Sequence, residues 1–363
     1  MNHQPDSLPS PFTQAQLAAA FAPFLDSPVL RVEEVLTGNI NTILRVRVGE
    51  QRYGLRVRTH ESVYRYEPDL IKEVFVLRVL QQSGSVPDDA AIAATFAQLT
   101  AARCGTLSQG FAGVPVVRYF DWSRARLPQP YCIYEWVEGQ PLWDTPEPTL
   151  YAATGQTLAG IHQARFSAFY ADFLSVGISP VSWLERFQAA LAKEINAARG
   201  RLPRRVNEAL LRLRPSVVAD CSPCLVHNDF APGNILVRDG RIAAVIDWDN
   251  AVVEAPHLDF VKMKYWTAKN AAGALVPEPT LFAAFVDGYG EAGRRIVASP
   301  TFLFYEVLWL LRVYNFECAK EEQGLPRAPG YPAAATYAEL IAAVTEGTPG
   351  FPLSLDGRGQ GRG

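Results

Sequence analysis

Apolar and polar residues alternate over three short segments near the start of the chain: residues 31–37, 42–48 and 51–58. A period of two is typical of strands that bury one face, and the short glycine-containing breaks between these segments favour hairpin turns. Just before them, Thr13 and Gln16 have the spacing of a capping box that opens a helix over 13–24. The pattern therefore predicts an N-terminal helix followed by an antiparallel sheet.

Helical spacing begins in residues 67–82, where apolar side chains recur three or four positions apart. An alanine-rich segment over 88–103 predicts a second helix that ends near Gly105. Two strand-like runs follow it: residues 114–120 and 130–137. The first third of the chain is thus predicted to be a small sheet with one or two helices.

Beyond a linker at 137–141 the pattern becomes mainly helical, with long helical stretches: residues 147–163, 183–198, 205–213 and 257–345. Short β-type runs interrupt these helices between residues 225 and 247. Within them, Asp239-Gly240 is a strong signal for a two-residue hairpin turn. A small hairpin is therefore predicted inside a helical region.

This layout predicts an α+β fold with two lobes. Residues 1–137 would form a β-rich N-terminal lobe, and residues 138–346 a mainly helical C-terminal lobe. A length of 363 residues also exceeds one typical domain. Residues 347–363 are rich in glycine and proline, so we expect them to form a disordered tail.

The composition of the chain limits the classes of molecule that it is expected to bind. A net charge of -3 gives no general attraction for nucleic acid or an anionic membrane, so neither is an expected partner. The N-terminus lacks a secretory pattern, and the five cysteines are odd in number, which together predict a cytoplasmic protein with reduced thiols. Cys221, Cys224 and His227 form a C-x2-C-x2-H string, but structural zinc sites need four ligands and buried thiols are the favoured interpretation.

Polar residues gather in the stretch 225–237, LVHNDFAPGNILV. Asp229 and Asn234 flank a Pro-Gly turn, and Asp247 follows the second strand of the predicted hairpin. Because a hairpin brings its two ends together, Asn234 and Asp247 are expected to lie side by side, as hard oxygen ligands suited to Mg2+. Asp229 would be free to accept a proton or orient a hydroxyl. A single such residue would indicate a turn cap, whereas three that converge favour a chemical role.

The motif H-N-D-F-A-P-G-N at 227–234, followed by I-D-W-D at 246–249, resembles the catalytic signature of the aminoglycoside phosphotransferase family. That family shares its fold with protein kinases and choline kinase-like enzymes. The resemblance spans about residues 30–320 in the expected order. It implies a bilobal protein kinase-like fold and transfer of the γ-phosphate of ATP, with Mg2+, to a hydroxyl of a small molecule.

The resemblance assigns a role to each matching residue. Asp229 would be the catalytic residue that accepts or steers the substrate hydroxyl. Asn234 and Asp247 would hold the Mg2+ ions that bridge the ATP phosphates. His227 would brace the loop and not act as the base, and Asp249 would support the site.

The N-terminal lobe is expected to contact the nucleotide. Residues 36–48 resemble a hairpin that covers phosphates, although protein kinases have three glycines there and this chain has one. Its candidate contacts are Gly38, Asn39, Asn41 and Thr42. Where protein kinases carry a phosphate-binding lysine, this chain offers Arg56 and Arg58; Arg56 fits better, but the choice stays open. Glu73 is the expected partner of this arginine.

The adenine base is expected to rest on the strand and hinge at 130–142, where backbone groups between Glu135 and Val137 would bind its edge. Two features depart from the family pattern. The segment 84–113 is longer than the usual connection, and Asn228 stands where glycine is frequent. Asp259 resembles the family residue that begins the next helix, and a structural role is favoured for it.

The acceptor site is expected in the helical lobe, where carboxylates lie among aromatic residues: Asp144, Glu254, Glu306 and Glu317, with Trp143, Trp183, Trp266, Tyr305 and Trp309. Such a mixture would suit a cationic or amphipathic hydroxyl compound, such as an aminoglycoside, a macrolide or an amino alcohol. Two alternatives stay open. A nucleotide-binding pseudokinase is favoured by the arginine-for-lysine change and the sparse glycines, whereas a protein kinase is disfavoured because no A-P-E-like segment follows Asp247.

Overall fold

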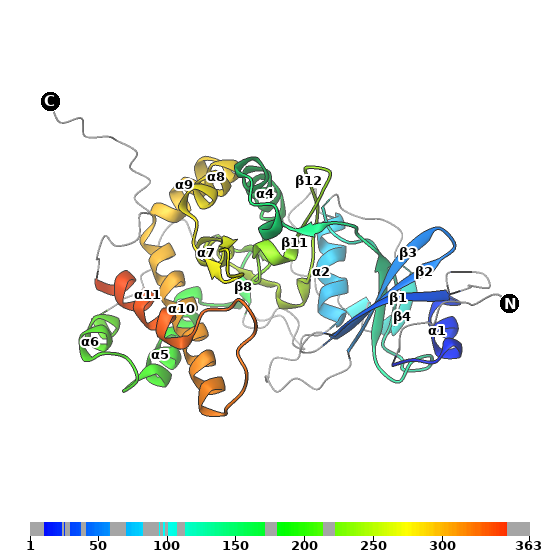
Figure 1. Cartoon of the computed structure of the whole chain (residues 1–363), viewed down its shortest axis with the longest axis horizontal. Coiled ribbons are helices and arrows are strands. Elements are labelled where there is room, and N and C mark those ends of the chain that lie inside the picture. Colours follow the sequence, from blue (N-terminus) through cyan, green and yellow to red (C-terminus); the bar gives the residue numbers. More distant parts are fainter. Residues whose placement is uncertain are drawn as a thin grey trace.

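The computed structural model of the chain describes these residues: 11–23, 25, 30–37, 41–58, 70–82, 94, 97–98, 101–106, 113–170, 180–212 and 222–346. An antiparallel sheet with two helices lies beside a larger helical region (Figure 1). Helix α2 (Leu70–Gln82) lies between them and contacts both the sheet and the turn at Trp248–Asn250. The predicted α+β arrangement, with the strands first and the helices after, is confirmed.

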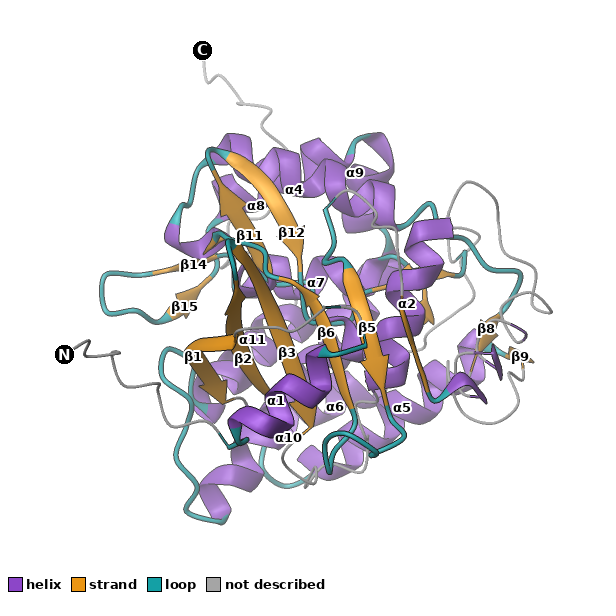
Figure 2. Cartoon of the chain, turned by 90° about the vertical axis from the view of Figure 1, so that its right-hand side faces the viewer, coloured by secondary structure: helices purple, strands orange, loops and turns teal. Residues whose placement is uncertain are grey.

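The sheet has six antiparallel strands in the order β1-β2-β3-β6-β5-β4. Its strands are β1 (Leu30–Thr37), β2 (Asn41–Val48), β3 (Gln51–Arg58), β4 (Cys104–Thr106), β5 (Val117–Asp121) and β6 (Tyr131–Glu135). Helix α1 (Gln14–Phe21) lies across one face of this sheet (Figure 2), and it begins with the predicted capping box of Thr13 and Gln16. The three predicted N-terminal strands are confirmed.

The two faces of the sheet have different partners. Leu55 and Val57 of β3 belong to a core that also contains Leu17 and Phe21 of α1. Because successive side chains of a strand point to opposite faces, Arg56 points away from α1, toward α2 and the helical region. Strand alternation thus places Arg56 at the boundary between the two parts of the molecule.

The helical region is built around the long helix α10, which packs against α5, α7, α9 and α11. Its helices are α4 (Pro148–Ile161), α5 (Trp183–Ala198), α6 (Arg204–Arg212), α7 (His257–Tyr265), α8 (Pro279–Tyr289), α9 (Glu291–Ala298), α10 (Pro300–Glu322) and α11 (Ala334–Glu346). Helices α4 and α8 approach closely because Gly155 and Gly288 lie at the contact; a Cβ atom on Gly288 would come within 1.9 Å of the Ala152 carbonyl oxygen.

The predicted hairpin is present as β11 (Ile235–Arg238) and β12 (Arg241–Val245). Asp239 and Gly240 have φ angles of 52° and 69°, and positive φ at both central positions is the geometry of a type I′ turn. Strand β7 (Gln140–Pro141) pairs with the other edge of β11, which ties the linker after the sheet to this hairpin. The remaining short elements are β8 (Phe169–Tyr170), β9 (Pro180–Val181), β10 (Cys224–Val226), β13 (Val252–Glu254), β14 (Ala268–Lys269), β15 (Leu275–Val276), and the 3-10 turns η1 (Leu142–Asp144), η2 (Pro232–Asn234) and η3 (Trp248–Asn250).

The alanine-rich helix ends close to Gly105, as predicted, but the strand that follows it was not predicted. The described residues of the alanine-rich segment are helical up to residue 102, but Arg103 adopts a left-handed φ of 53° and Cys104–Thr106 form the edge strand β4. The helix therefore stops before Gly105, which pairs with Phe120 of β5 in the sheet. The strand conformation of Cys104–Thr106 is therefore determined by backbone hydrogen bonds with β5, and not by local helix propensity.

Two further expectations concern the chain as a whole. The tail predicted to be disordered, 347–363, lies outside the described residues. Among the helices that are described, no single one is both long and apolar enough to cross a membrane; α9 and α10 meet that criterion only as a pair bent by 67°.

Candidate active site

One buried carboxylate anchors the loop that follows β10. Asp259, in the first turn of α7, accepts the backbone N–H groups of His227 and Asn228, both at 2.8 Å. Its Oδ2 atom also lies 3.1 Å from Nε2 of His162, and both of these side chains are almost fully buried. Hydrogen bonds to an ionised acceptor are strong, so this carboxylate fixes the start of the loop. These contacts fit the structural role expected for Asp259.

His227 is committed to the loop through both of its ring nitrogens. Nδ1 accepts the backbone N–H of Asp229 at 3.2 Å, so the ring hydrogen lies on Nε2, which donates to the Ile246 carbonyl oxygen at 2.9 Å. The ring thereby braces the loop against the residues after β12. Neither nitrogen has a lone pair left for zinc, and Cys224 is buried; Cys221 lies outside the described residues.

The backbone conformation at Asn228 explains how asparagine can stand where glycine is frequent. Its φ angle is 62°, a left-handed conformation that glycine adopts freely and that asparagine tolerates better than other side chains. The side chain also donates to the Asn250 carbonyl oxygen at 3.0 Å. Asparagine therefore preserves the bend that glycine would provide and adds a hydrogen bond to the turn after Asp247.

Asp229 is held by a lysine that the sequence did not reveal. Lys262 of α7 donates from Nζ to Oδ1 of Asp229 in an ion pair whose two side chains are only 18% and 24% exposed. Burial acts to raise the pKa of Asp229, but the Lys262 charge and hydrogen bond outweigh it and hold that pKa below its usual value. The available signal was spacing: Lys262 follows Asp259 by three positions, which places both on one face of α7.

Asn234 and Asp247 lie together, as the predicted hairpin requires. Ile235 pairs with Val245 across the hairpin, and the backbone N–H of Ile246 donates to the Asn234 carbonyl oxygen at 2.9 Å. Asp247 follows at once, with a left-handed φ of 69° and a side chain that is 39% exposed. Such a strained non-glycine residue is typical of functional sites.

This pair of residues fits Mg2+. The side-chain amide of Asn234 donates from Nδ2 to the Asp229 backbone carbonyl at 2.9 Å, which leaves its Oδ1 atom as the ligand oxygen. Mg2+ usually takes one or two protein oxygens and completes its shell with water and phosphate. In the described part of the chain, no group of three or more His, Cys, Asp or Glu residues forms a metal cluster. The donor set therefore suits a metal that is bound together with phosphates.

Arg56 gathers three carboxylates at the boundary between the sheet and the helical region. Its guanidinium lies 3.1 Å from Glu73 on α2, 2.9 Å from Asp247 and 2.7 Å from Asp249. The predicted contact between Arg56 and Glu73 is confirmed, and Arg56 is 4% exposed whereas Arg58 is only partly buried. The structure thus brings Arg56 into the site, and Asp249 lies beside Asp247 as a second acceptor of the same guanidinium.

The ionisable groups of this cluster shift one another's pKa values. Burial raises the pKa of Glu73 to about 7, although the Arg56 charge acts in the opposite direction. Burial and the neighbouring Asp247 raise the pKa of Asp249 as well. Burial opposes the charge on Arg56, but its carboxylate neighbours raise the pKa of the guanidinium well above its usual value. The cluster is therefore a permanent cation that holds carboxylates of unequal acidity.

The candidate phosphate-covering residues have different positions. Gly38 and Asn39 lie outside the described residues. Thr42 is 4% exposed within the sheet. Asn41 instead reaches Arg56: with its amide oxygen turned toward the guanidinium, it accepts bonds of 3.2 and 2.6 Å from Nε and Nη2. Asn41 therefore helps to fix Arg56, a contact that the strand pattern did not reveal.

Among the hinge residues from Glu135 to Val137, one has a backbone that forms no hydrogen bond with the sheet. The N–H of Glu135 donates to the Val116 carbonyl at 2.9 Å, and that of Trp136 donates to the Arg52 carbonyl at 3.0 Å. The Glu135 side chain pairs with Arg118. Val137 makes no backbone hydrogen bond to another described residue. Of the backbone groups expected to bind adenine, those of Val137 are therefore the best placed.

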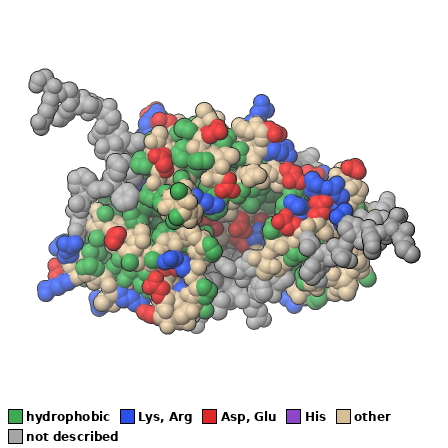
Figure 3. All heavy atoms as spheres, in the orientation of Figure 1, with side chains coloured by type: hydrophobic (Ala, Val, Ile, Leu, Met, Phe, Trp, Pro, Cys, Tyr) green, Lys and Arg blue, Asp and Glu red, His purple; other side chains and the backbone are tan. Residues whose placement is uncertain are grey.

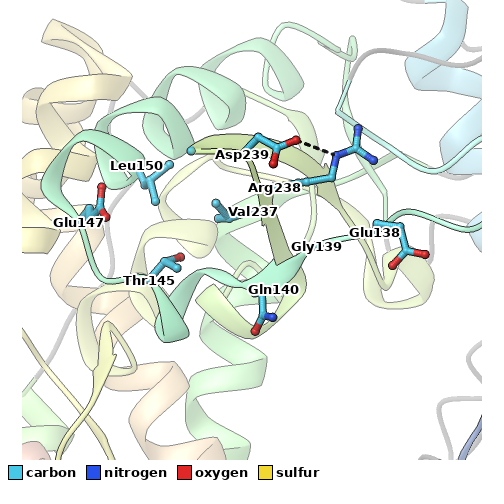
Figure 4. Close-up of a pocket in the computed structure, with 10 residues that line it drawn as sticks. Glu138, Gly139, Gln140, Thr145, Glu147, Leu150, Val237, Arg238 and Asp239 are labelled. Carbon is cyan, nitrogen blue, oxygen red and sulfur yellow. Dashed lines mark ion pairs between the residues drawn. The ribbon is translucent and has the colours of Figure 1, made fainter.

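Figure 3 shows a hollow between the helical region and the sheet in which acidic side chains gather. A separate cavity of about 430 Å³ lies beside the linker (Figure 4). It is lined by residues of the linker, the start of α4 and the tip of the hairpin, among them Glu138, Gln140, Glu147, Leu150, Val237 and Asp239. None of the expected catalytic or metal-binding residues lines this cavity, so it is not the site of the chemistry.

Comparison with known proteins supports the assignment by sequence motif. The model of the phosphotransferase enzyme family matches residues 31–298 of the chain. No curated protein matches the sequence significantly. The family match includes β1 to α9, and so includes all of the site residues described above.

Several solved structures share the fold at low sequence identity. A Ralstonia eutropha JMP134 protein assigned to the aminoglycoside phosphotransferases has 15% identity and a TM-score of 0.58, over 91% of this chain and 95% of its own. Aminoglycoside phosphotransferase APH(4)-Ia has 17% identity and a TM-score of 0.57, over 93% and 99%. A thermostable variant of that enzyme, in a ternary complex with ADP and hygromycin B, has 17% identity and a TM-score of 0.55, over 88% and 96%. With the family model matching well over half of its length, the chain belongs to the phosphotransferase enzyme family and has the kinase-like fold of the aminoglycoside phosphotransferases.

Proposed function

We propose that this small-molecule phosphotransferase uses ATP and Mg2+ and phosphorylates a hydroxyl group. The observation that carries the proposal is the convergence of Asp229, Asn234 and Asp247 at one end of the hairpin, with Arg56 bonded to Asp247. These residues supply what phosphoryl transfer needs: a carboxylate for the hydroxyl, oxygens for the metal and a cation near the phosphates.

In the proposed reaction, Asp229 accepts a hydrogen bond from the acceptor hydroxyl and aligns its oxygen with the γ-phosphorus. The hydroxyl oxygen bonds to phosphorus, ADP leaves, and the hydroxyl proton passes to Asp229. A pKa below the usual value keeps Asp229 ionised and able to accept that proton. Mg2+ held by Asn234 and Asp247 would neutralise charge on the phosphate oxygens.

The nucleotide is proposed to bind between the sheet and the hairpin. The complex of the APH(4)-Ia variant with ADP supports a nucleotide as the phosphoryl donor. Arg56 would contact phosphates, and Val137 would bind the adenine edge through its backbone. Gly38, Asn39 and Thr42 remain predicted contacts of the phosphates.

The hygromycin B bound to that variant supports a small hydroxyl-bearing acceptor. The pseudokinase alternative rested on arginine in place of lysine and on the sparse glycines. The ion pair of Arg56 with Glu73 supports a phosphate-binding role for the arginine, and Gly38 lies outside the described residues. No observation favours a protein kinase. The lobe boundaries at residue 137 and a cytoplasmic location remain predictions from the sequence.

The substitution Asp229→Asn tests the proposal. We expect ATP binding, measured by calorimetry with Mg2+, to change little, because Asp229 acts on the acceptor. Phosphorylation of a broad panel of hydroxyl compounds, measured as ADP release, should fall by about 10²-fold or more. Asp239→Asn is the matched control, because Asp239 lies exposed at the hairpin tip. Wild-type protein that binds Mg-ATP and phosphorylates nothing in the panel would favour the pseudokinase.

A further inference from the structure

The carboxylates expected to attract a cationic acceptor already have basic partners within the chain. The four pairs are Asp144–Lys269 at 3.2 Å, Glu317–Lys320 at 3.6 Å, Glu306–Lys264 and Glu254–Arg186. Glu306 also accepts the Tyr265 hydroxyl at 3.0 Å, and Glu254 accepts that of Tyr305 at 2.7 Å. An incoming ammonium group therefore finds none of these four acids without a cation.

Two of the five aromatic rings expected to attract a cation also have a lysine of the chain over them. The Lys269 ammonium lies 4.1 Å from the ring centroid of Trp143, and the Lys262 ammonium lies 5.4 Å from that of Trp266. Cation–π attraction to these two indoles is thus supplied from within the chain. All four acids and two of the five aromatic rings expected to attract a cationic acceptor therefore have a basic partner within the chain.

These residues lie next to the catalytic loop. Trp143 packs on Gly233, where a Cβ atom would come within 2.3 Å of the indole ring. Lys262 is bonded to Asp229 itself. Trp266 makes an edge contact with Tyr331, at 5.0 Å between ring centroids. Burial raises the pKa of Tyr331, and the negative charges of Asp229 and Glu317 act in the same direction.

We propose that the acceptor is a hydroxyl compound without a positive charge, and that Lys262 is the residue that selects against cations. This inference rests on the proposed phosphoryl transfer to a hydroxyl. To bind one of these partners, a cationic acceptor would have to displace the lysine that already contacts it. The displaced lysine would stay nearby and repel the acceptor, so the exchange would gain little free energy. An uncharged acceptor meets no such cost and can contact the partly exposed rings of Trp143 and Tyr331.

Matched pairs of compounds test this selection. 3,3-Dimethyl-1-butanol is an uncharged isostere of choline, and glucose has a hydroxyl where glucosamine has an amine. We would measure ADP release with Mg-ATP, and binding in the presence of Mg-ADP by ligand-observed NMR. In the wild type we expect the uncharged member of a pair to be favoured by roughly tenfold or more in kcat/KM or Kd.

Two variants test whether the Lys262 charge causes the preference for uncharged compounds. Lys262→Met keeps the length of the side chain and removes its charge, and we expect it to reduce the preference for uncharged compounds by about tenfold. Lys193→Met is the matched control, because Lys193 is exposed on α5 outside the site; it should keep the wild-type preference.

Each remaining outcome contradicts the inference. Wild-type preference for the cationic member, equal treatment of both members, or failure to bind either would overturn the assignment of acceptor class. An unchanged preference in Lys262→Met would overturn the role of Lys262. Failure of the phosphotransferase proposal is recognised separately, as ADP release that does not differ between wild type and Asp229→Asn, while the NMR ranking of the pairs still decides the acceptor class.

Discussion

Two basic residues hold the acidic groups of the candidate active site, and they do so in different ways. Arg56 comes from the sheet, is 4% exposed and binds Glu73, Asp247 and Asp249 at once. Lys262 comes from α7, has a side chain that is 18% exposed and pairs with one carboxylate among the described residues, that of Asp229. The guanidinium has a planar fork that serves several acceptors, whereas an ammonium is a compact charge on a flexible stem. The Arg56 cluster therefore connects two parts of the molecule, while the Lys262 pair tunes one carboxylate.

Removal of the arginine should have the largest effect. Arg56→Met would leave Glu73 and Asp249 as buried carboxylates without their cation, which we expect to lower the free energy of unfolding by about 3–5 kcal/mol. Chemical denaturation monitored by tryptophan fluorescence measures this change. The matched control is Arg238→Met, whose side chain is 59% exposed and should alter stability by less than about 0.5 kcal/mol.

The substitution Arg56→Lys separates the role of the positive charge from that of the forked guanidinium. It keeps the positive charge but loses the fork, so we expect part of the stability to return and phosphoryl transfer to stay below the wild-type rate. If Arg56→Met cost no more than the Arg238→Met control, the cluster would not connect the two parts of the molecule.

The Arg56 cluster should also make stability depend on pH. Burial raises the pKa of Glu73 to about 7 in the folded protein, compared with 4.5 as its usual value. The folded state therefore retains a proton that the unfolded chain has released, so this contribution to stability is complete below pH 4.5 and is lost as the pH rises through about 7. The full effect is on the order of 3 kcal/mol.

Glu73→Gln should remove this dependence. Denaturation midpoints measured between pH 4.5 and 8 should decline in the wild type and decline less in Glu73→Gln. Glu208→Gln, at an exposed carboxylate on α6, should follow the wild-type curve. Parallel curves for the wild type and Glu73→Gln would show that Glu73 is ionised throughout, in conflict with its burial.

The difference between the two basic residues also explains what could be predicted from the sequence. Arg56 and Glu73 were found because a strand, a helix and a motif define their positions together. Lys262 belongs to no motif, and a lysine on an amphipathic helix is normally solvated. Its contact with Asp229 depends on how Asp259 docks α7 against the loop, and that is a property of tertiary packing. The strand β4 was missed for a similar reason, because its partner β5 determines it.

Compared with the substitutions of Arg56, removal of Lys262 should lower the free energy of unfolding less. Its main effect should be on the pKa of Asp229. Lys262→Met leaves Asp229 partly exposed to water, so the loss of stability should be smaller than that of Arg56→Met, at about 1–2 kcal/mol. Without the lysine charge, burial is the dominant effect and the pKa of Asp229 should rise. The acid-side pKa of the kcat/KM profile for an accepted substrate should therefore move upward by roughly 1–2 units relative to the wild type.

Lys262→Arg separates this electrostatic effect from simple damage to the fold. It retains a cation beside Asp229, so its acid-side pKa should stay near that of the wild type even if its rate is lower. A purely structural role for Lys262 would instead lower the rate equally at every pH in both variants. Equal profiles in Lys262→Met and Lys262→Arg would therefore contradict the distinction drawn between Lys262, which tunes a carboxylate, and Arg56, which joins two parts of the molecule.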